Sequence, residues 1–135
     1  MRTLLVIDDN QSVRESLRFL FLRRGYDVLV AENGAEGIAL AKQHWVDAAM
    51  VDVNMPGMNG VDVCKALREQ ATAAGRPISV WMMTGARTPD LAKRALEAGA
   101  LALLGKPFDF ADLFRQFDEK LGAPVVPQAG PETPP

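Results

Sequence analysis

The stretch MVDVNMPGMNG, residues 50–60, carries an apolar run up to an aspartate and then turns abruptly. The run ends at Asp52, and Pro56, Gly57 and Gly60 follow within eight residues. Proline and glycine favour tight turns, and apolar residues recur at helical spacing just beyond them. The stretch therefore predicts a strand, a tight loop and the start of a helix, with a carboxylate where the strand leaves the core.

The same alternation of strand and helix continues outward from this stretch in both directions. Short apolar runs bounded by turn residues predict five strands buried on both faces, at residues 3–7, 27–31, 47–51, 77–83 and 101–104. Helical periodicity follows each run, with Gly25 predicted to end the first helix and Asp109 to cap the fifth. This alternation predicts an α/β fold, a doubly wound, open parallel sheet with helices on both faces.

Composition restricts the class of protein. The chain has 135 residues, 48% of them hydrophobic, which suits one domain with one core. The formal net charge of −2 lacks the basic excess of a nucleic-acid binder, so no bound nucleic acid is expected. The single cysteine, Cys64, has no disulfide partner and is expected to be a helix-face residue in a reducing compartment. No run resembles a signal peptide or a membrane span, so we expect a cytoplasmic protein without membrane contact.

Residues 122–135 differ in composition from the rest of the chain. They hold five of the nine prolines. Segments of this kind favour extended or disordered structure because they bury little apolar surface. We therefore predict one domain over residues 1–121 and a disordered tail or linker over residues 122–135.

Polar side chains follow four of the five predicted strands, at the points where ligands bind in sheets of this kind. Asp8 and Asp9 follow the first strand, Asp52 the third, Thr84 the fourth and Lys106 the fifth. If the first and third strands are neighbours, the three carboxylates share one small pocket. Oxygen ligands without a nearby thiolate or imidazole suit Mg²⁺, and a lysine beside Mg²⁺ is typical of a phosphoryl-binding site.

This chemistry explains why the chain carries a carboxylate out of its core. Asp52 is predicted to be a nucleophile that forms an aspartyl phosphate, and the tight loop behind it leaves room for the incoming phosphoryl group. The main-chain carbonyl of Asn54 is expected to reach the metal. The hydroxyl of Thr84 can donate a hydrogen bond to a phosphoryl oxygen.

Four motifs together resemble a known family. The segments LLVIDDN (4–10), MVDVNMPGMNG (50–60), MMTG (82–85) and GKPF (105–108), in this order, are similar to the receiver domain of bacterial two-component response regulators. The resemblance covers about residues 3–121. It implies a flavodoxin-like (βα)5 sheet with the strand order 2-1-3-4-5.

The resemblance also implies a function for each motif. Asp52 would accept a phosphoryl group, in an Mg²⁺-dependent reaction, from the phosphohistidine of a sensor histidine kinase or from a phosphotransfer protein. Asp8 and Asp9 would help to hold Mg²⁺, with Asp9 and Asp52 as direct ligands. Thr84 and Lys106 would bind the phosphoryl oxygens, and the peptide bond between Lys106 and Pro107 would be cis. Such a protein is a regulator rather than an enzyme: it assists its own phosphorylation and dephosphorylation and then changes its affinity for a protein partner.

Two departures from the family pattern affect the expected output surface. Leu103 stands where most receivers have Tyr or Phe, and Leu101 and Ala102 stand where many have two acids. If Leu101 and Leu103 share one face of the fifth strand, the surface of the fourth helix, fifth strand and fifth helix is unusually apolar and docks a downstream partner or a second copy of the chain. The alternative is that both leucines pack beneath the fourth helix.

Two other functions use similar residues, and the sequence argues against both. An Mg²⁺-dependent phosphatase with an aspartyl nucleophile typically needs a second aspartate two residues later as general acid, and this position holds Asn54, which cannot donate a proton in that role. A binding module that has lost phosphorylation would not need all five predicted site residues, and this chain has them all. The five are Asp8, Asp9, Asp52, Thr84 and Lys106.

Overall fold

The structure is a computed structural model that describes residues 2–122. Five strands alternate with five helices along this part of the chain. The strands are β1 (Thr3–Ile7), β2 (Asp27–Ala31), β3 (Ala48–Asp52), β4 (Ser79–Thr84) and β5 (Ala102–Gly105). The helices are α1 (Gln11–Arg23), α2 (Gly34–Gln43), α3 (Gly60–Ala73), α4 (Pro89–Glu97) and α5 (Phe110–Leu121). The predicted tail or linker, apart from Gly122, lies outside the described residues.

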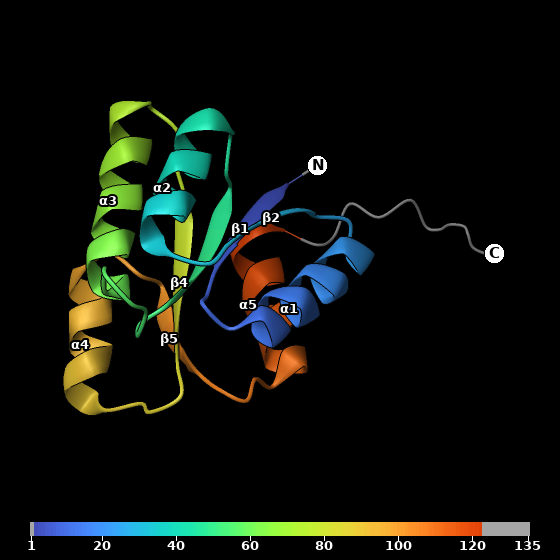
Figure 1. Ribbon diagram of the computed structural model, residues 1–135. Helices are drawn as coiled ribbons and strands as arrows, with labels where there is room; N and C mark the ends of the chain where they lie inside the picture. The colour runs from blue at the N-terminus through green and yellow to red at the C-terminus, as the bar shows by residue number, and fades with distance from the viewer. Residues whose placement is uncertain (1, 123–135) are drawn as a thin grey trace.

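The strands form one parallel sheet in the order β2-β1-β3-β4-β5, which confirms the predicted fold and strand order (Figure 1). The predicted bounds of the last three strands lie one or two residues too early. The apolar runs stop before polar residues or glycine, but the backbone pairing continues, with Asp52 opposite Met83 and Thr84 opposite Gly105. The carboxylate of Asp52 therefore belongs to the last residue of β3 itself.

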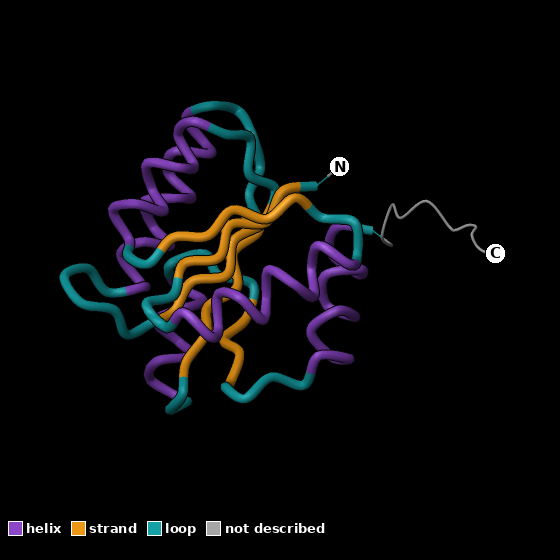
Figure 2. The backbone as a smooth tube through the Cα atoms, turned by 45° about the vertical axis from the view of Figure 1, so that its right-hand side comes forward, coloured by secondary structure: helices purple, strands orange, loops and turns teal. Residues whose placement is uncertain are grey.

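Helices cover both faces of the sheet, and successive strand residues enter different cores (Figure 2). Leu5, Ile7 and Val51 pack in the core that includes side chains of α2, α3 and α4. Leu4 and Met50 pack in the core formed with α1 and α5. Burial on both faces explains why these strands are continuous apolar runs in the sequence.

An aromatic group fixes α1 and α5 against the sheet. The rings of Trp81 on β4 and Phe117 on α5 stack with centroids 4.0 Å apart and an interplanar angle of 14°. Phe21 of α1 adds a second ring, with its centroid 4.7 Å from that of Phe117. The indole nitrogen of Trp81 donates a hydrogen bond to the Gln116 side chain over 3.0 Å, so burial of this residue leaves no unpaired N–H.

All five helices begin at a residue whose side chain accepts a main-chain hydrogen bond. These residues are Asn10, Asn33, Asn59, Thr88 and Asp109, so the predicted cap of the last helix is confirmed. Each cap satisfies a main-chain N–H that has no partner within its helix. In a sheet of this topology the capped helix ends lie at the edge where the strands end, and they fix the loops that carry the site.

Two further predictions concern single residues. Gly25 follows α1 with a φ of 86°, the left-handed conformation expected of a residue that ends a helix. Cys64 is buried and free, as the sequence indicated, and burial raises the pKa of its thiol to about 11. None of the helices in residues 2–122 is long and apolar enough to cross a membrane.

The expectation that Leu101 and Leu103 share one exposed face is wrong. The fifth strand begins at Ala102, so Leu101 precedes it and is 38% exposed. Leu103 is only 4% exposed and packs in the core that includes Ala95 of α4. The alternative, packing beneath the fourth helix, therefore holds for Leu103 and not for Leu101.

Gly60 marks the closest approach of the loop after β3 to the strand itself. Its amide donates to the main-chain oxygen of Val53 over 2.9 Å. A Cβ at this position would overlap the main-chain oxygen of Asp52 and lie 2.8 Å from the Cα of Val53. Because backbone cannot yield as a flexible side chain does, only glycine fits here without moving the end of β3.

We expect Gly60→Ala to lower the free energy of unfolding by about 1–3 kcal/mol, the usual effect of overpacking. Thermal or urea denaturation measures this. Gly85→Ala is the matched control, because a Cβ there meets nothing within 4 Å. Equal stability of the two variants would show that β3 and its loop adjust freely.

Candidate functional site

Three carboxylates meet at the edge of the sheet where the strands end. Asp52 closes β3, and Asp8 and Asp9 follow β1, which pairs directly with β3. One oxygen from each carboxylate lies within 4.8 Å of those of the other two. Asp8 is fully buried and Asp52 nearly so, whereas Asp9 is exposed. The structure thus brings together the three acids that the sequence predicted to share a pocket.

Lys106 places an ammonium group in the same pocket. Its Nζ lies 2.7 Å from Oδ2 of Asp8 and 3.5 Å from Oδ1 of Asp52. The lysine is held by its main chain, since its amide donates to the Thr84 carbonyl over 2.8 Å and its peptide bond to Pro107 is cis, as predicted. The fifth strand therefore delivers one positive charge to a site with three negative ones.

The electrostatics of Asp52 are those of a crowded, buried carboxylate. Burial raises its pKa from 3.8 to about 6, and the neighbouring charge of Asp8 acts in the same direction. The ammonium of Lys106 opposes both effects through its charge and its hydrogen bond. One ammonium against three carboxylates leaves two negative charges in excess when all are ionised, which suits a divalent cation with oxygen ligands.

The hydroxyl of Thr84 is buried and bonded within its own loop. Its Oγ1 accepts from the Ala86 amide over 3.1 Å and donates to the Ala86 carbonyl over 3.3 Å. A hydroxyl donates only one hydrogen bond, so contact with a phosphoryl group requires Thr84 to release the Ala86 carbonyl. The predicted role of Thr84 therefore requires the loss of its donated hydrogen bond to the Ala86 carbonyl.

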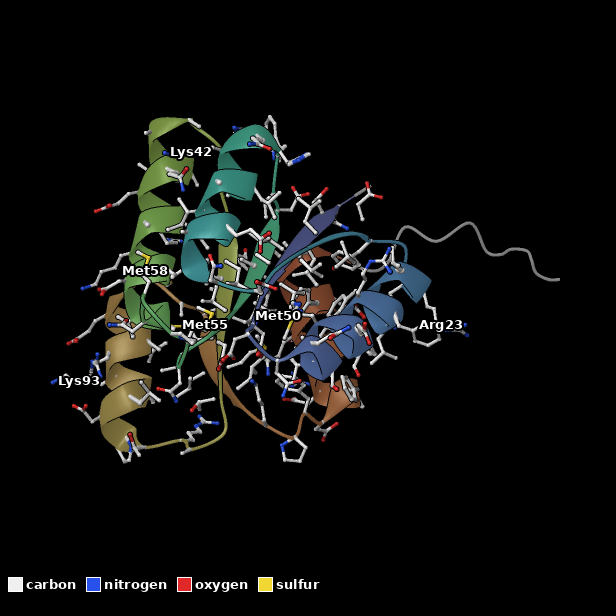
Figure 3. The ribbon with its side chains drawn as sticks, in the orientation of Figure 1. Arg23, Lys42, Met50, Met55, Met58 and Lys93 are labelled. Atoms are coloured by element: carbon white, nitrogen blue, oxygen red, sulfur yellow. The ribbon has the colours of Figure 1, made fainter. Side chains whose placement is uncertain are left out.

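The loop after Asp52 is anchored on both sides. Met55 and Met58, labelled in Figure 3, are half-buried and pack against the core shared with α2, α3 and α4. Gly57 lies between them with a φ of 88°, a conformation that favours glycine. Asn54 is exposed in this loop, and the expectation that its carbonyl binds a metal stays a prediction.

Sequence reasoning missed two supports of Asp8. The Asn10 amide donates to Oδ1 of Asp8 over 2.9 Å, and the guanidinium of Arg14 donates to the Asp8 main-chain oxygen over 2.8 Å. Asn10 was detectable as a polar residue just before a helical pattern. Arg14 had no such signal, because a basic residue one turn into a helix is usually solvated.

Comparisons with known proteins agree with this geometry. The family model described as "Response regulator receiver domain" matches residues 4–118. The response regulator MprA of Mycobacterium sp. strain KMS is 34% identical over 131 residues, which are 97% of this chain and 55% of that protein. The chain spans between 12% and 55% of the length of the curated relatives that it matches first.

Two solved structures extend the comparison. The chemotaxis protein CheY4 of Vibrio cholerae is 32% identical, with a TM-score of 0.79 over 88% of this chain and 98% of that one. The CheX–CheY–BeF3–Mg²⁺ complex of Borrelia burgdorferi matches with a TM-score of 0.80 over 89% of each chain, but at 24% identity it supports the fold alone.

The raised pKa of Asp52 predicts a pH-dependent penalty on stability in metal-free solution. Because the folded protein binds this proton more tightly than the unfolded chain, the penalty is absent below pH 4, grows between pH 4 and 6, and is complete above pH 6. It amounts to about 3 kcal/mol. Asp52→Asn should therefore unfold at a higher temperature than the parent at pH 8 in EDTA, and the difference should shrink towards pH 4.

Asp27→Asn, at an exposed position of β2, is the matched control for this measurement and should leave stability unchanged across the same pH range. If Asp52→Asn is no more stable than the parent at pH 8, the carboxylate is not strained by its surroundings.

Proposed function

The chain belongs to the response regulator receiver domain family of two-component systems, and from this premise we propose that it is a switch controlled by phosphorylation of Asp52. Receiver domains are signalling regulators rather than conventional enzymes. The observation that carries the proposal is the cluster of Asp8, Asp9 and Asp52 with the ammonium of Lys106 among them.

Mg²⁺ is the cofactor that this site suits. The family binds Mg²⁺ at an acidic pocket, and the oxygen-only donor set and the charge excess of two fit a hard divalent cation. We propose that Asp9 and Asp52 bind it directly, that Asp8 supports it, and that the Asn54 carbonyl adds a ligand. When bound, Mg²⁺ neutralises the carboxylates and the phosphoryl oxygens, so that two anions can approach each other.

Each side chain has a defined part in the transfer. A carboxylate oxygen of Asp52 attacks phosphorus, the new P–O bond forms as the P–N bond of the donor phosphohistidine breaks, and the imidazole leaves with the bonding electrons and is protonated. Lys106 turns from Asp8 towards the phosphoryl oxygens. Thr84 donates its hydroxyl to another of these oxygens. The donor is a sensor histidine kinase or a phosphotransfer protein.

We propose that phosphorylation alters the loop of Thr84 and, through it, the partner-binding surface formed by α4, β5 and α5. Leu96 of α4 and Leu101, just before β5, are exposed, at 56% and 38%. Leu103, buried, takes no part in that surface and cannot act as the moving aromatic of other receivers. Release of the Ala86 carbonyl by Thr84 is therefore the event that alters affinity for a downstream partner or a second copy of the chain.

Some broader expectations belong to the same proposal. A cytoplasmic location without nucleic-acid or membrane contact by this domain accords with the family and with the formal charge of −2. The family match ends at residue 118, which supports a domain over residues 1–121 followed by a tail or linker over residues 122–135.

Incubation with acetyl phosphate and Mg²⁺ should add one phosphoryl group to the chain, as measured by intact mass spectrometry. Asp52→Asn, or EDTA in place of Mg²⁺, should abolish the addition. Asp62→Asn, which alters an exposed acid at the start of α3, should leave it unchanged. Modification that persists in Asp52→Asn would falsify the assignment of the acceptor.

The output step makes a separate prediction. Phosphorylation should change amide hydrogen exchange in residues 85–91, because Thr84 gives up its bond to the Ala86 carbonyl. Thr84→Val, which keeps the side-chain shape but loses the hydroxyl, should still be phosphorylated and should lose most of this change. Thr72→Val, at an exposed position of α3, is the control. An unaltered exchange response in Thr84→Val contradicts the proposed coupling.

A further inference from the structure

A cavity of about 380 Å³ lies between the C-terminal ends of α2 and α3, at the edge of the sheet opposite to Asp52. Its apolar lining comes from Ala41, Leu67, Ala71 and Ala74 on or next to the two helices, and from Val46 and Ile78 just before β3 and β4. In Figure 3 the labelled Lys42 marks this end of α2. The site is therefore separate from the carboxylate cluster, which lies where β3 ends.

The charged side chains that line this cavity, Lys42 and Arg76, are of one sign. His44 also lines it, and no carboxylate does so among the described residues. The chain as a whole has more acidic than basic groups, with 17 Asp and Glu against 15 Lys and Arg. A cavity whose charged side chains are both cationic is therefore not the consequence of a basic chain, and it favours an anionic ligand.

Gln70 provides a second, independent observation. It lines the cavity, and both its amide nitrogen and its amide oxygen are buried without a hydrogen-bond partner in the described part of the chain. Buried side-chain amides are nearly always paired, since an unpaired one loses the hydrogen bonds it makes to water. A ligand with an acceptor group would satisfy the amide N–H of Gln70.

The rim of the cavity has the composition of a binding site. Trp45 is 58% exposed, and the guanidinium carbon of Arg76, which lines the cavity, lies 4.7 Å from the centre of its ring. The stacked ring holds the guanidinium in place beside the opening. Trp45 therefore contributes by holding the Arg76 guanidinium at the cavity, rather than by lining the cavity itself.

We propose that this cavity binds a small amphipathic anion, a carboxylate on a short apolar body. The apolar part would lie among the alanines, Val46 and Ile78. The carboxylate would accept hydrogen bonds from Arg76 and the Gln70 amide, with Lys42 adding charge. The volume is at the lower end of the range for small-molecule sites, about 300–1,000 Å³, and suits a compact molecule better than a peptide segment.

The probe for this site is octanoate, with octanol and octylammonium as neutral and cationic molecules of the same chain length. Titration into the full chain is followed by ¹H–¹⁵N NMR. Octanoate should give saturable shifts of the Gln70 side-chain amide and the Trp45 indole N–H. The two comparison molecules should bind about fivefold or more weakly, because they cannot pair with the cationic rim.

Variants then separate the charges from the apolar cavity. The double variant Lys42→Gln, Arg76→Gln should bind octanoate about fivefold more weakly while its melting temperature and its affinity for octanol stay unchanged. The matched control is Lys65→Gln, Arg18→Gln, which removes two exposed cations elsewhere and should bind octanoate as the parent does.

Several outcomes would overturn the proposal. These are no saturable shift at millimolar octanoate, equal affinity for octanol, undiminished binding by the Lys42 and Arg76 double variant, or shifts centred on Asp52 instead of Gln70. Saturable binding of an acidic, leucine-containing peptide without binding of octanoate would also overturn it, since the site would then serve a protein partner.

Discussion

The contact between the ammonium of Lys106 and the carboxylates of Asp8 and Asp52 is the interaction on which the electrostatics of the site depend. Two carboxylates about 4 Å apart repel by about 4 kcal/mol at an effective dielectric of 20, and here three share one pocket. Lys106, at 2.7 Å and 3.5 Å from two of them, offsets part of that repulsion and leaves a charge excess that attracts a divalent cation. Burial, and then the neighbouring charge of Asp8, raise the pKa of Asp52 to about 6. Repulsion among the carboxylates is therefore only partly offset without a metal, and the site is suited to bind one.

The fold keeps these side chains in place because strand pairing, burial of the strands and helix caps fix the elements that carry them. Direct pairing of β1 with β3 fixes the spacing of the acids, and burial of both strands on two faces prevents a change of register. Capped helix ends secure the loops around the site, and the stacked rings of Trp81 and Phe117 fix α5, which follows Lys106 and the cis proline. The hydroxyl of Thr84 bonds to Ala86, two residues along the chain, and its donated bond to the Ala86 carbonyl must be given up before it can donate to another acceptor.

Much of this could be predicted from the sequence, because strands buried on two faces leave continuous apolar runs and the acids directly follow them. The strand order, the acidic cluster and the cap at Asp109 followed from such local patterns and from the family resemblance. What could not be predicted depends on contacts between distant residues. Leu103 is buried because it packs in the core with Ala95 of α4, and Arg14 supports Asp8 through a backbone oxygen that no periodicity reveals. The unpaired amide of Gln70 is likewise visible only in three dimensions.

A crystal structure of the chain with Mg²⁺ and beryllium fluoride, an analogue of the phosphoryl group, tests the central claim most directly. The account predicts beryllium fluoride bonded to a carboxylate oxygen of Asp52, Mg²⁺ bound by Asp9 and Asp52, and the Nζ of Lys106 moved from Asp8 to a fluorine atom. It also predicts the Thr84 hydroxyl within hydrogen-bonding distance of a second fluorine. Beryllium fluoride absent from Asp52 at saturating concentration, or an ammonium still paired with Asp8 beside a bound beryllium fluoride, would contradict the account.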